Sequence, residues 1–400
     1  MNNRSFLSIS LLLFLFFPYV GVVNGIDTQP NFILLCFAIT PVLLRTALPL
    51  NFTIICLLSL SAFLLSFILH ADNITWKYAL TYLFILLNIY YIKWAISAGL
   101  LNLNATFITV VLACYVFVGL VQLYEPSFLA GVVTRGVDAV YTFAESNRGV
   151  RSLSPEPATL GKVINILFVF FVFQLATKHP VGLYRKVLFT IIVFFFILAL
   201  VPRSAYALMM FIIIVIPLIY LINRRTLFIT LMLLLSVTTA FLVLYPEFQS
   251  SRIYVMFKIL LEEPSLLLQQ GAMRRVLNIP ISINNLLYFG PFGASNDPAR
   301  VDAVLHTPIG QLHYEAFNRN LGGFIEIVLK FGLLSLPIMM LYGHSLYRIL
   351  TLRLDSCDFK IGYWLCYAVL VITFQDGSPA LALTWFLLLY LSSYRSRHGS

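Results

Sequence analysis

The chain has 400 residues, of which 60% are hydrophobic and only 10% are charged. An average soluble domain is about 45–50% apolar and about 25% charged, so the composition excludes a set of soluble domains. The apolar residues form runs of about 15–23 residues, the length that crosses a hydrocarbon layer about 30 Å thick. The sequence therefore predicts an all-α polytopic membrane protein that lies in a lipid bilayer.

The net charge of +10 does not indicate a nucleic-acid partner, because no basic run with interleaved aromatic residues occurs. In an apolar chain, basic residues set the orientation or attract anions at the membrane surface. The 5 cysteines include no Cys-x-x-Cys pair, so neither a zinc site nor a disulfide framework is indicated. We expect no metal and no cofactor.

Apolar runs separated by polar or charged breaks predict about twelve spanning helices. Their ranges are 5–24, 32–49, 52–70, 78–98, 105–124, 161–177, 186–201, 205–222, 227–245, 321–347, 361–375 and 379–394. The first run follows Arg4, as in a signal peptide, but it ends without a clear Ala-x-Ala cleavage site. We therefore expect it to remain as a helix.

Basic residues alternate between the breaks in a way that predicts orientation. If Arg4 is cytoplasmic, every second break is also basic, through Arg45, Lys93, Lys178, Arg185, Lys186, Arg224, Arg225, Arg348, Arg353, Lys360, Arg395 and Arg397. The short breaks on the other side carry only Lys77 and Arg203. Cytoplasmic loops are enriched in Lys and Arg, so both termini are predicted to face the cytoplasm.

This orientation divides the chain into five parts. Residues 1–124 hold the first five helices, 161–245 the next four, and 321–400 the last three with a cytoplasmic tail. Between them, 125–160 and 246–320 form two long loops on the outer side, and loops of such length are usually functional. Apolar and charged residues alternate over 246–263, which predicts an amphipathic helix on the outer leaflet.

Few ionisable groups occur within the predicted spans, where a transporter would place its substrate or ion site. The exceptions are His70, Lys93, and Glu326 with Lys330. Glu326 and Lys330 are spaced i, i+4, so they either pair on one helix face or contribute Glu326 to a site.

Arginines gather instead on the outer side of the membrane. The candidate ligand-binding set is Arg148, Arg151, Arg203, Arg274, Arg275, Arg300 and Arg319. A guanidinium presents a planar fork of donors that fits phosphate oxygens, although contact with anionic lipid headgroups is the alternative for each arginine. Arg203 is the more telling position, because the positive-inside rule disfavours a cation in a short outer loop.

Two outer residues are candidates for handling a proton. In the segment Ser154-Pro155-Glu156-Pro157, Ser154 is predicted to cap a helix, and an acid in the first turn is then explained structurally. Glu156 also follows two arginines closely, where a carboxylate can orient a hydroxyl. His313 is either a structural histidine or a general base near neutral pH. We predict His313 as the base and Glu156 as the orienting carboxylate.

The segment Asn147-Arg148-Gly149-Val150-Arg151-Ser152-Leu153-Ser154-Pro155-Glu156-Pro157-Ala158 resembles a segment of the bacterial O-antigen and exopolysaccharide polymerases, the Wzy group. In that family an arginine-rich stretch ends in Glu-Pro-Ala or Glu-Pro-Ser. The order of Arg274-Arg275, Gly290-Pro291-Phe292-Gly293, His313, Gly322-Gly323-Phe324-Ile325-Glu326 and Phe331-Gly332-Leu333-Leu334 is similar to the family's large periplasmic loop and following helix. The outer loops lack a clean Arg-x10-Gly repeat, a pattern of some members, so a scheme based on two such repeats does not follow.

The resemblance implies a C-type glycosyltransferase-like fold in the bacterial inner membrane and lipopolysaccharide biosynthesis as the role. A hydroxyl of one undecaprenyl-pyrophosphate-linked repeat unit would attack the reducing-end carbon of the growing chain at the periplasmic face. A chain-length regulator and a flippase are partners that the resemblance allows. The outer loops contain no Asp-x-Asp pair, which favours a metal-independent reaction.

Two other functions stay open at the level of sequence. An O-antigen ligase uses the same donor and shares a large loop with Arg and His, but the Glu156-Pro157 segment favours a polymerase. A flippase or other carrier is the alternative from a different class, and the charge-poor spans argue against it.

The orientation is tested by reporter fusions along the chain. Fusions after Asn223 and Ser356 should report cytoplasm, and fusions near Val140 and Asp297 should report periplasm, because the basic breaks alternate in that order. A periplasmic signal after Asn223 would contradict the orientation and every outer-side assignment.

Overall fold

The computed structural model describes residues 3–21, 30–44, 46–69, 76–133, 149–178, 182–222, 258, 262, 305–307, 310–312, 327–328, 331, 332–352, 361–374 and 381–394. Its α-helices are α1 (Asn3–Phe16), α2 (Asn31–Leu43), α3 (Leu50–Leu69), α4 (Trp76–Ser97), α5 (Ala105–Tyr124), α7 (Pro157–Lys178), α8 (Leu183–Leu200), α9 (Ala205–Ile222), α17 (Leu336–Leu350), α18 (Ile361–Phe374) and α19 (Ala382–Ser393). Short 3₁₀ helices, η2 (Ala130–Val132) and η4 (Gly332–Ser335), and a hairpin of β1 (Leu305–Thr307) and β2 (Gly310–Leu312) complete the described elements.

The helices confirm an all-α membrane protein in its coarse outline. Within the described ranges, 5 helices are long and apolar enough to cross a membrane, namely α3, α5, α7, α8 and the continuous η4–α17 segment. Every predicted span contains a helix except 227–245, which lies outside the described residues. The full number of spans and the limits of the long loops remain predictions.

The first predicted span is wrong at its end, because α1 stops at Phe16 rather than near 24. Pro18 lacks an N–H and disfavours the helical conformation of the residue before it. Past this turn, Val20 forms an isolated antiparallel bridge with Val133, and the Gly21 N–H donates to the carbonyl of Val132 at 3.2 Å. The chain after α1 therefore packs against the chain after α5.

The tenth span also differs from the prediction of one continuous helix over 321–347. The backbone tightens to the 3₁₀ helix η4, and α17 begins only at Leu336. Gly332 has φ +54°, a conformation that glycine adopts without steric cost. Of the amphipathic helix predicted over 246–263, Lys258 and Glu262 are described, and they form an exposed i, i+4 ion pair at 3.8 Å.

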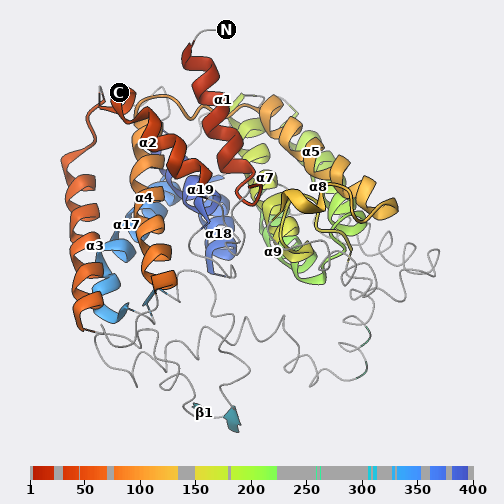
Figure 1. The fold of residues 1–400 in the computed structure, drawn as a ribbon. Helices are drawn as coiled ribbons and strands as arrows, with labels where there is room; N and C mark the ends of the chain where they lie inside the picture. Colours follow the sequence, from red (N-terminus) through yellow and green to blue (C-terminus); the bar gives the residue numbers. More distant parts are fainter. Residues whose placement is uncertain are drawn as a thin grey trace.

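The bundle is built around α7 and α19. In Figure 1, α3, α4 and α17 lie on one side and α5, α8 and α9 on the other, with α18 and α19 between them. Most of α7 and nearly all of α19 are buried, whereas few residues of α3 are buried. A helix buried all round belongs at the centre of a bundle, and an apolar exposed face suits contact with lipid.

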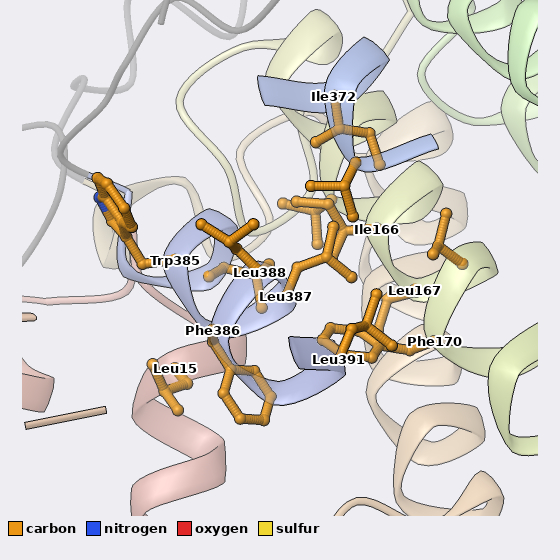
Figure 2. Close-up of a cluster of buried hydrophobic side chains, with 14 of the residues drawn as sticks. Leu15, Ile166, Leu167, Phe170, Ile372, Trp385, Phe386, Leu387, Leu388 and Leu391 are labelled. Carbon is orange, nitrogen blue, oxygen red and sulfur yellow. The ribbon is translucent and has the colours of Figure 1, made fainter. Parts of the chain in front are cut away.

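Aromatic rings join α1, α7 and α19 at this centre. The ring centroids of Phe16, Phe170 and Phe386 lie 5.4–5.9 Å apart in pairs. Figure 2 shows Leu15 of α1 beside Phe386, and Leu167 and Leu391 beside Phe170. Lipid tails are as apolar as these side chains, so close packing rather than exclusion of water stabilises the contact.

Polar bonds between helices join ends that the predicted orientation assigns to the same side. On the predicted cytoplasmic side, Lys93 donates from Nζ to Ser393 Oγ at 2.7 Å, and Trp94 Nε1 donates to the Thr46 carbonyl at 2.7 Å. A further bond involves the middle of a helix: the hydroxyl of Tyr115, halfway along α5, donates to the carbonyl of Phe16, the last residue of α1, at 2.7 Å. Lys93, an exception among the apolar spans, thus ties α4 to α19.

Close contact between α7 and α9 depends on Gly161. A Cβ placed on Gly161 would lie 2.1 Å from the Cβ of Ala207, so only glycine allows this approach. Gly343 in α17 offers a matched control, because a Cβ there would meet nothing within 4 Å.

We expect Gly161→Ala to destabilise the protein by about 1–3 kcal/mol through overpacking. By contrast, Gly343→Ala should be neutral or should stabilise α17 by up to about 1 kcal/mol, because alanine is the better helix former. Thermal unfolding of both variants in detergent measures the difference. Equal transition temperatures for the two variants would contradict the tight α7–α9 contact.

Candidate functional site

The candidate site lies at the end of the bundle where α1, α5 and α8 end and α7 and α9 begin, here named the outer end. Residues 149–156, here named the strap, lead into α7 across this end. The Val150 N–H donates to the Val201 carbonyl at 3.2 Å, which docks the strap on the turn between α8 and α9. Gly149 has φ +78°, and a Cβ on it would lie 2.3 Å from the Pro202 oxygen, so glycine is required at this contact.

Ser152 is held in an unusual conformation at the centre of the strap. Its φ is +51°, its side chain is buried, and its hydroxyl donates to the Tyr115 carbonyl at 2.7 Å. Gln122 Oε1 accepts the Ser152 N–H at 2.8 Å, while Gln122 Nε2 donates to the Ser152 carbonyl at 3.3 Å. A non-glycine residue in this region costs about 1–3 kcal/mol and persists only where its surroundings hold it.

The start of α7 corrects the predicted helix cap. The helix begins at Pro157, so Glu156 rather than Ser154 occupies the N-cap position. Pro157 fits the first helical position, where its missing N–H has no cost. The Ser154 hydroxyl donates instead to the carbonyls of Arg151 at 2.7 Å and Glu156 at 3.0 Å. Glu156 is half-buried at the positive end of the α7 dipole, which favours an anion.

Arg203 occupies the turn between α8 and α9 with φ +46°. Its Nε donates to the Leu200 carbonyl at 3.3 Å, so the side chain covers the C-terminus of α8 with a cation, a favourable arrangement for the helix dipole. The residue is half-buried and reaches the surface of the outer end. The structure thus gives Arg203 a structural contact in addition to its predicted ligand contact.

Three predicted site residues, Arg151, Glu156 and Arg203, gather at the outer end. Arg151 and Glu156 belong to the strap, and a Cβ on Gly149 would lie 2.9 Å from the Cβ of Arg203. Arg151 is only 1% exposed, so its charge lies beneath the surface that Arg203 reaches. The other predicted site residues lie outside the described residues: Arg148, Arg274, Arg275, Arg300, His313, Arg319 and Glu326.

Backbone strain in the described chain concentrates at the same end. The non-glycine residues described with positive φ are Leu129, Ser152 and Arg203, and all of them lie in the segments that meet there. Strained residues cluster where a site must be rigid before its ligand arrives. The backbone segments that carry Arg151, Glu156 and Arg203 are therefore held in defined conformations.

Sequence reasoning missed two polar side chains of this end, Lys162 and Gln122. Lys162 is 6% exposed, less than two turns after Glu156, and its position just inside a predicted span was the available signal. Three residues later, Asn165 Nδ2 donates to the Ala207 carbonyl at 3.1 Å. Gln122 gave no local signal, because its partners Phe128 and Ser152 are set by the tertiary fold.

No family model, curated protein or solved structure matches the chain. In the part of the chain that the structure describes, no group of 3 or more His, Cys, Asp or Glu side chains could hold a metal ion. The chemistry available at the outer end is that of its arginines and its carboxylate.

Two replacements of Arg203 separate the effect of its backbone strain on stability from the effect of its side-chain bond. Glycine adopts positive φ freely, so Arg203→Gly should change stability by less than about 1 kcal/mol despite the lost bond to Leu200. Arg203→Val also removes the guanidinium, but a β-branched residue at this φ should cost about 1–2 kcal/mol. Thermal unfolding in detergent compares the two variants, and a less stable glycine variant would contradict the strained turn.

Proposed function

We propose that the protein is a membrane glycosyltransferase that polymerises undecaprenyl-pyrophosphate-linked repeat units, an O-antigen polymerase of the periplasmic face of the bacterial inner membrane. One observation carries the proposal: the strap, which holds Arg151 and Glu156, docks on the α8–α9 turn, which holds Arg203, at one end of an apolar bundle. Two arginines and a carboxylate at a membrane surface fit an anionic lipid-linked donor and a hydroxyl acceptor.

The pyrophosphate is the part of the donor that the arginines would recognise. Arg203 Nε covers Leu200, so in this proposal its terminal nitrogens meet the phosphate oxygens. Arg151 adds positive charge from the buried side, where low dielectric strengthens its effect on a departing anion. Arg148, Arg274, Arg275, Arg300 and Arg319 are proposed to complete the contact from the outer loops.

The transfer itself breaks the bond between the reducing-end carbon and the pyrophosphate oxygen. A hydroxyl oxygen of the acceptor repeat unit forms the new bond to that carbon, and the hydroxyl proton passes to His313. Glu156, at the N-terminus of α7, orients the hydroxyl, and Glu326 is proposed to contact sugar hydroxyls. Undecaprenyl pyrophosphate leaves with the bonding electron pair, stabilised by the arginines.

The positions of the buried polar side chains described in α7 help to distinguish an enzyme from a flippase or other carrier. Gln174 is buried near the opposite end of α7, whereas Lys162, the buried cation of this helix, and Asn165 lie within its first three turns at the outer end. A transporter places such groups near the middle of the membrane, where its substrate crosses. Their position therefore supports chemistry at one face. The Glu156-Pro157 segment keeps the polymerase ahead of the ligase in our proposal.

The lipopolysaccharide ladder of a deletion strain tests the function and separates the alternatives. A single repeat unit on the core is expected, because ligation would continue without polymerisation. Bare core would identify a ligase, and accumulated precursor on the cytoplasmic side would identify a flippase.

In the same strain, His313→Gln and Glu156→Gln test the proposed roles, since each replacement removes an ionisable group at similar size. We expect His313→Gln to abolish polymer formation. Glu156→Gln should lower the rate of polymerisation by at most about 10²–10⁴-fold, the range of general acid–base contributions. Purified variants with lipid-linked repeat units measure the rate. Activity in His313→Gln with none in Glu156→Gln would reverse the roles, and wild-type rates in both would exclude both residues.

A further inference from the structure

We propose that Gln122 is a positioning residue for Arg151: it fixes the strap by binding both backbone groups of Ser152. The inference rests on the proposed function, because it assigns Arg151 to the recognition of a pyrophosphate. Gln122 is 1% exposed in the last turn of α5, and its partner Ser152 lies 30 residues later in the chain. Its role therefore depends on a tertiary contact.

The Gln122 side chain uses both of its donor hydrogens and its acceptor. Nε2 donates to the carbonyls of Phe128 at 2.9 Å and Ser152 at 3.3 Å, while Oε1 accepts the Ser152 N–H at 2.8 Å. One side-chain amide thus binds both the N–H and the carbonyl of Ser152, and no other neutral side chain except asparagine offers the same set of groups. Gln122 thus joins the end of α5, the turn after it and the strap.

The peptide group between Arg151 and Ser152 is held from both sides. Its N–H donates to Gln122, and its carbonyl accepts from the N–H of Ser154 at 3.1 Å and the Ser154 hydroxyl at 2.7 Å. On the other side of Arg151, the Val150 N–H is bound to Val201. The peptide group that follows Arg151 is therefore bound at both its N–H and its carbonyl, and the Gly149–Val150 peptide group is bound one peptide group before Arg151. These bonds restrict the position from which the Arg151 side chain extends.

Ser152 needs this hold because its φ is +51°. Without Gln122, a serine would relax toward negative φ, and the adjacent peptide group would rotate with it. Arg151 would then move relative to the turn that carries Arg203. A glycine at 152 would remain in the same conformation at no steric cost, so Ser152→Gly should reduce the dependence on Gln122.

The test is the affinity of the purified full chain in detergent for undecaprenyl pyrophosphate, with undecaprenol as the uncharged comparison. Gln122→Leu should weaken binding of undecaprenyl pyrophosphate by about tenfold to a hundredfold. This is the effect expected when a displaced Arg151 loses one charged hydrogen bond to the pyrophosphate. In the Ser152→Gly background the same replacement should cost less than about threefold, whereas in the Ser152→Ala background the full loss should remain. Gln174 is also a buried glutamine, but it lies at the end of α7 away from the strap. The control variant Gln174→Leu should therefore bind like the wild type.

A second measurement does not depend on the ligand. Arg151 should resist modification by phenylglyoxal in the wild type, because it is 1% exposed, and should react in Gln122→Leu but not in Gln174→Leu. Mass spectrometry quantifies the modification. Should Gln122→Leu fail to accumulate, Gln122→Glu replaces it, since the carboxylate keeps the acceptor and the size but loses both donors.

The outcomes separate the two proposals. Equal losses in the glycine and alanine backgrounds, or wild-type affinity in Gln122→Leu, would overturn the positioning role. Unchanged protection of Arg151 in Gln122→Leu would overturn it as well. If the wild type binds undecaprenyl pyrophosphate no better than undecaprenol, the proposed function fails, and the modification of Arg151 alone then decides whether Gln122 positions it.

Discussion

The outer end depends on one constraint: backbone that leaves a helix among apolar helices must have its N–H and C=O groups bound. The strap meets this constraint with bonds from Gln122, Val201 and Ser154 rather than with regular secondary structure. These bonds fix where Arg151 and Glu156 lie. The charges of the site are therefore placed by neutral hydrogen bonds, which do not weaken with salt as attraction between exposed charges would.

Close backbone approach is the second requirement, and glycines provide it from three different segments. Gly119 of α5, Gly149 of the strap and Gly161 of α7 each face the stretch 201–207, where a Cβ would lie 2.1–2.3 Å from its nearest atom. Helix packing in membranes relies on such small residues because the hydrophobic effect does not drive one helix against another in lipid, so association depends on close van der Waals contact. The stretch that carries Arg203 is thus contacted by α5, by α7 and by the strap, which carries Arg151 and Glu156.

Helix positions were predictable from the sequence because the length of an apolar run is a local property. Helix ends were less so. Pro155 and Pro157 both suit a first helical position, and the bonds from Ser154 to the carbonyls of Arg151 and Glu156 decide for Pro157. Gln122 could not be predicted, since a polar residue near the end of a span has no local mark that separates a solvent contact from a tertiary one. Lys162 was marked only by its position just inside a predicted span, and its burial depends on the tertiary fold.

Arg203 carries two independent costs in one residue. Its φ of +46° strains the backbone, and the predicted orientation puts its charge in a short loop on the side where the positive-inside rule disfavours cations. A glycine would make the same turn without either cost. The bond from Nε to the Leu200 carbonyl at 3.3 Å stabilises the end of α8 only slightly, so it does not offset these costs. Since strain concentrates where a group must be held ready for a ligand, both costs are accounted for if the guanidinium binds an anion at the membrane surface, as proposed for the pyrophosphate.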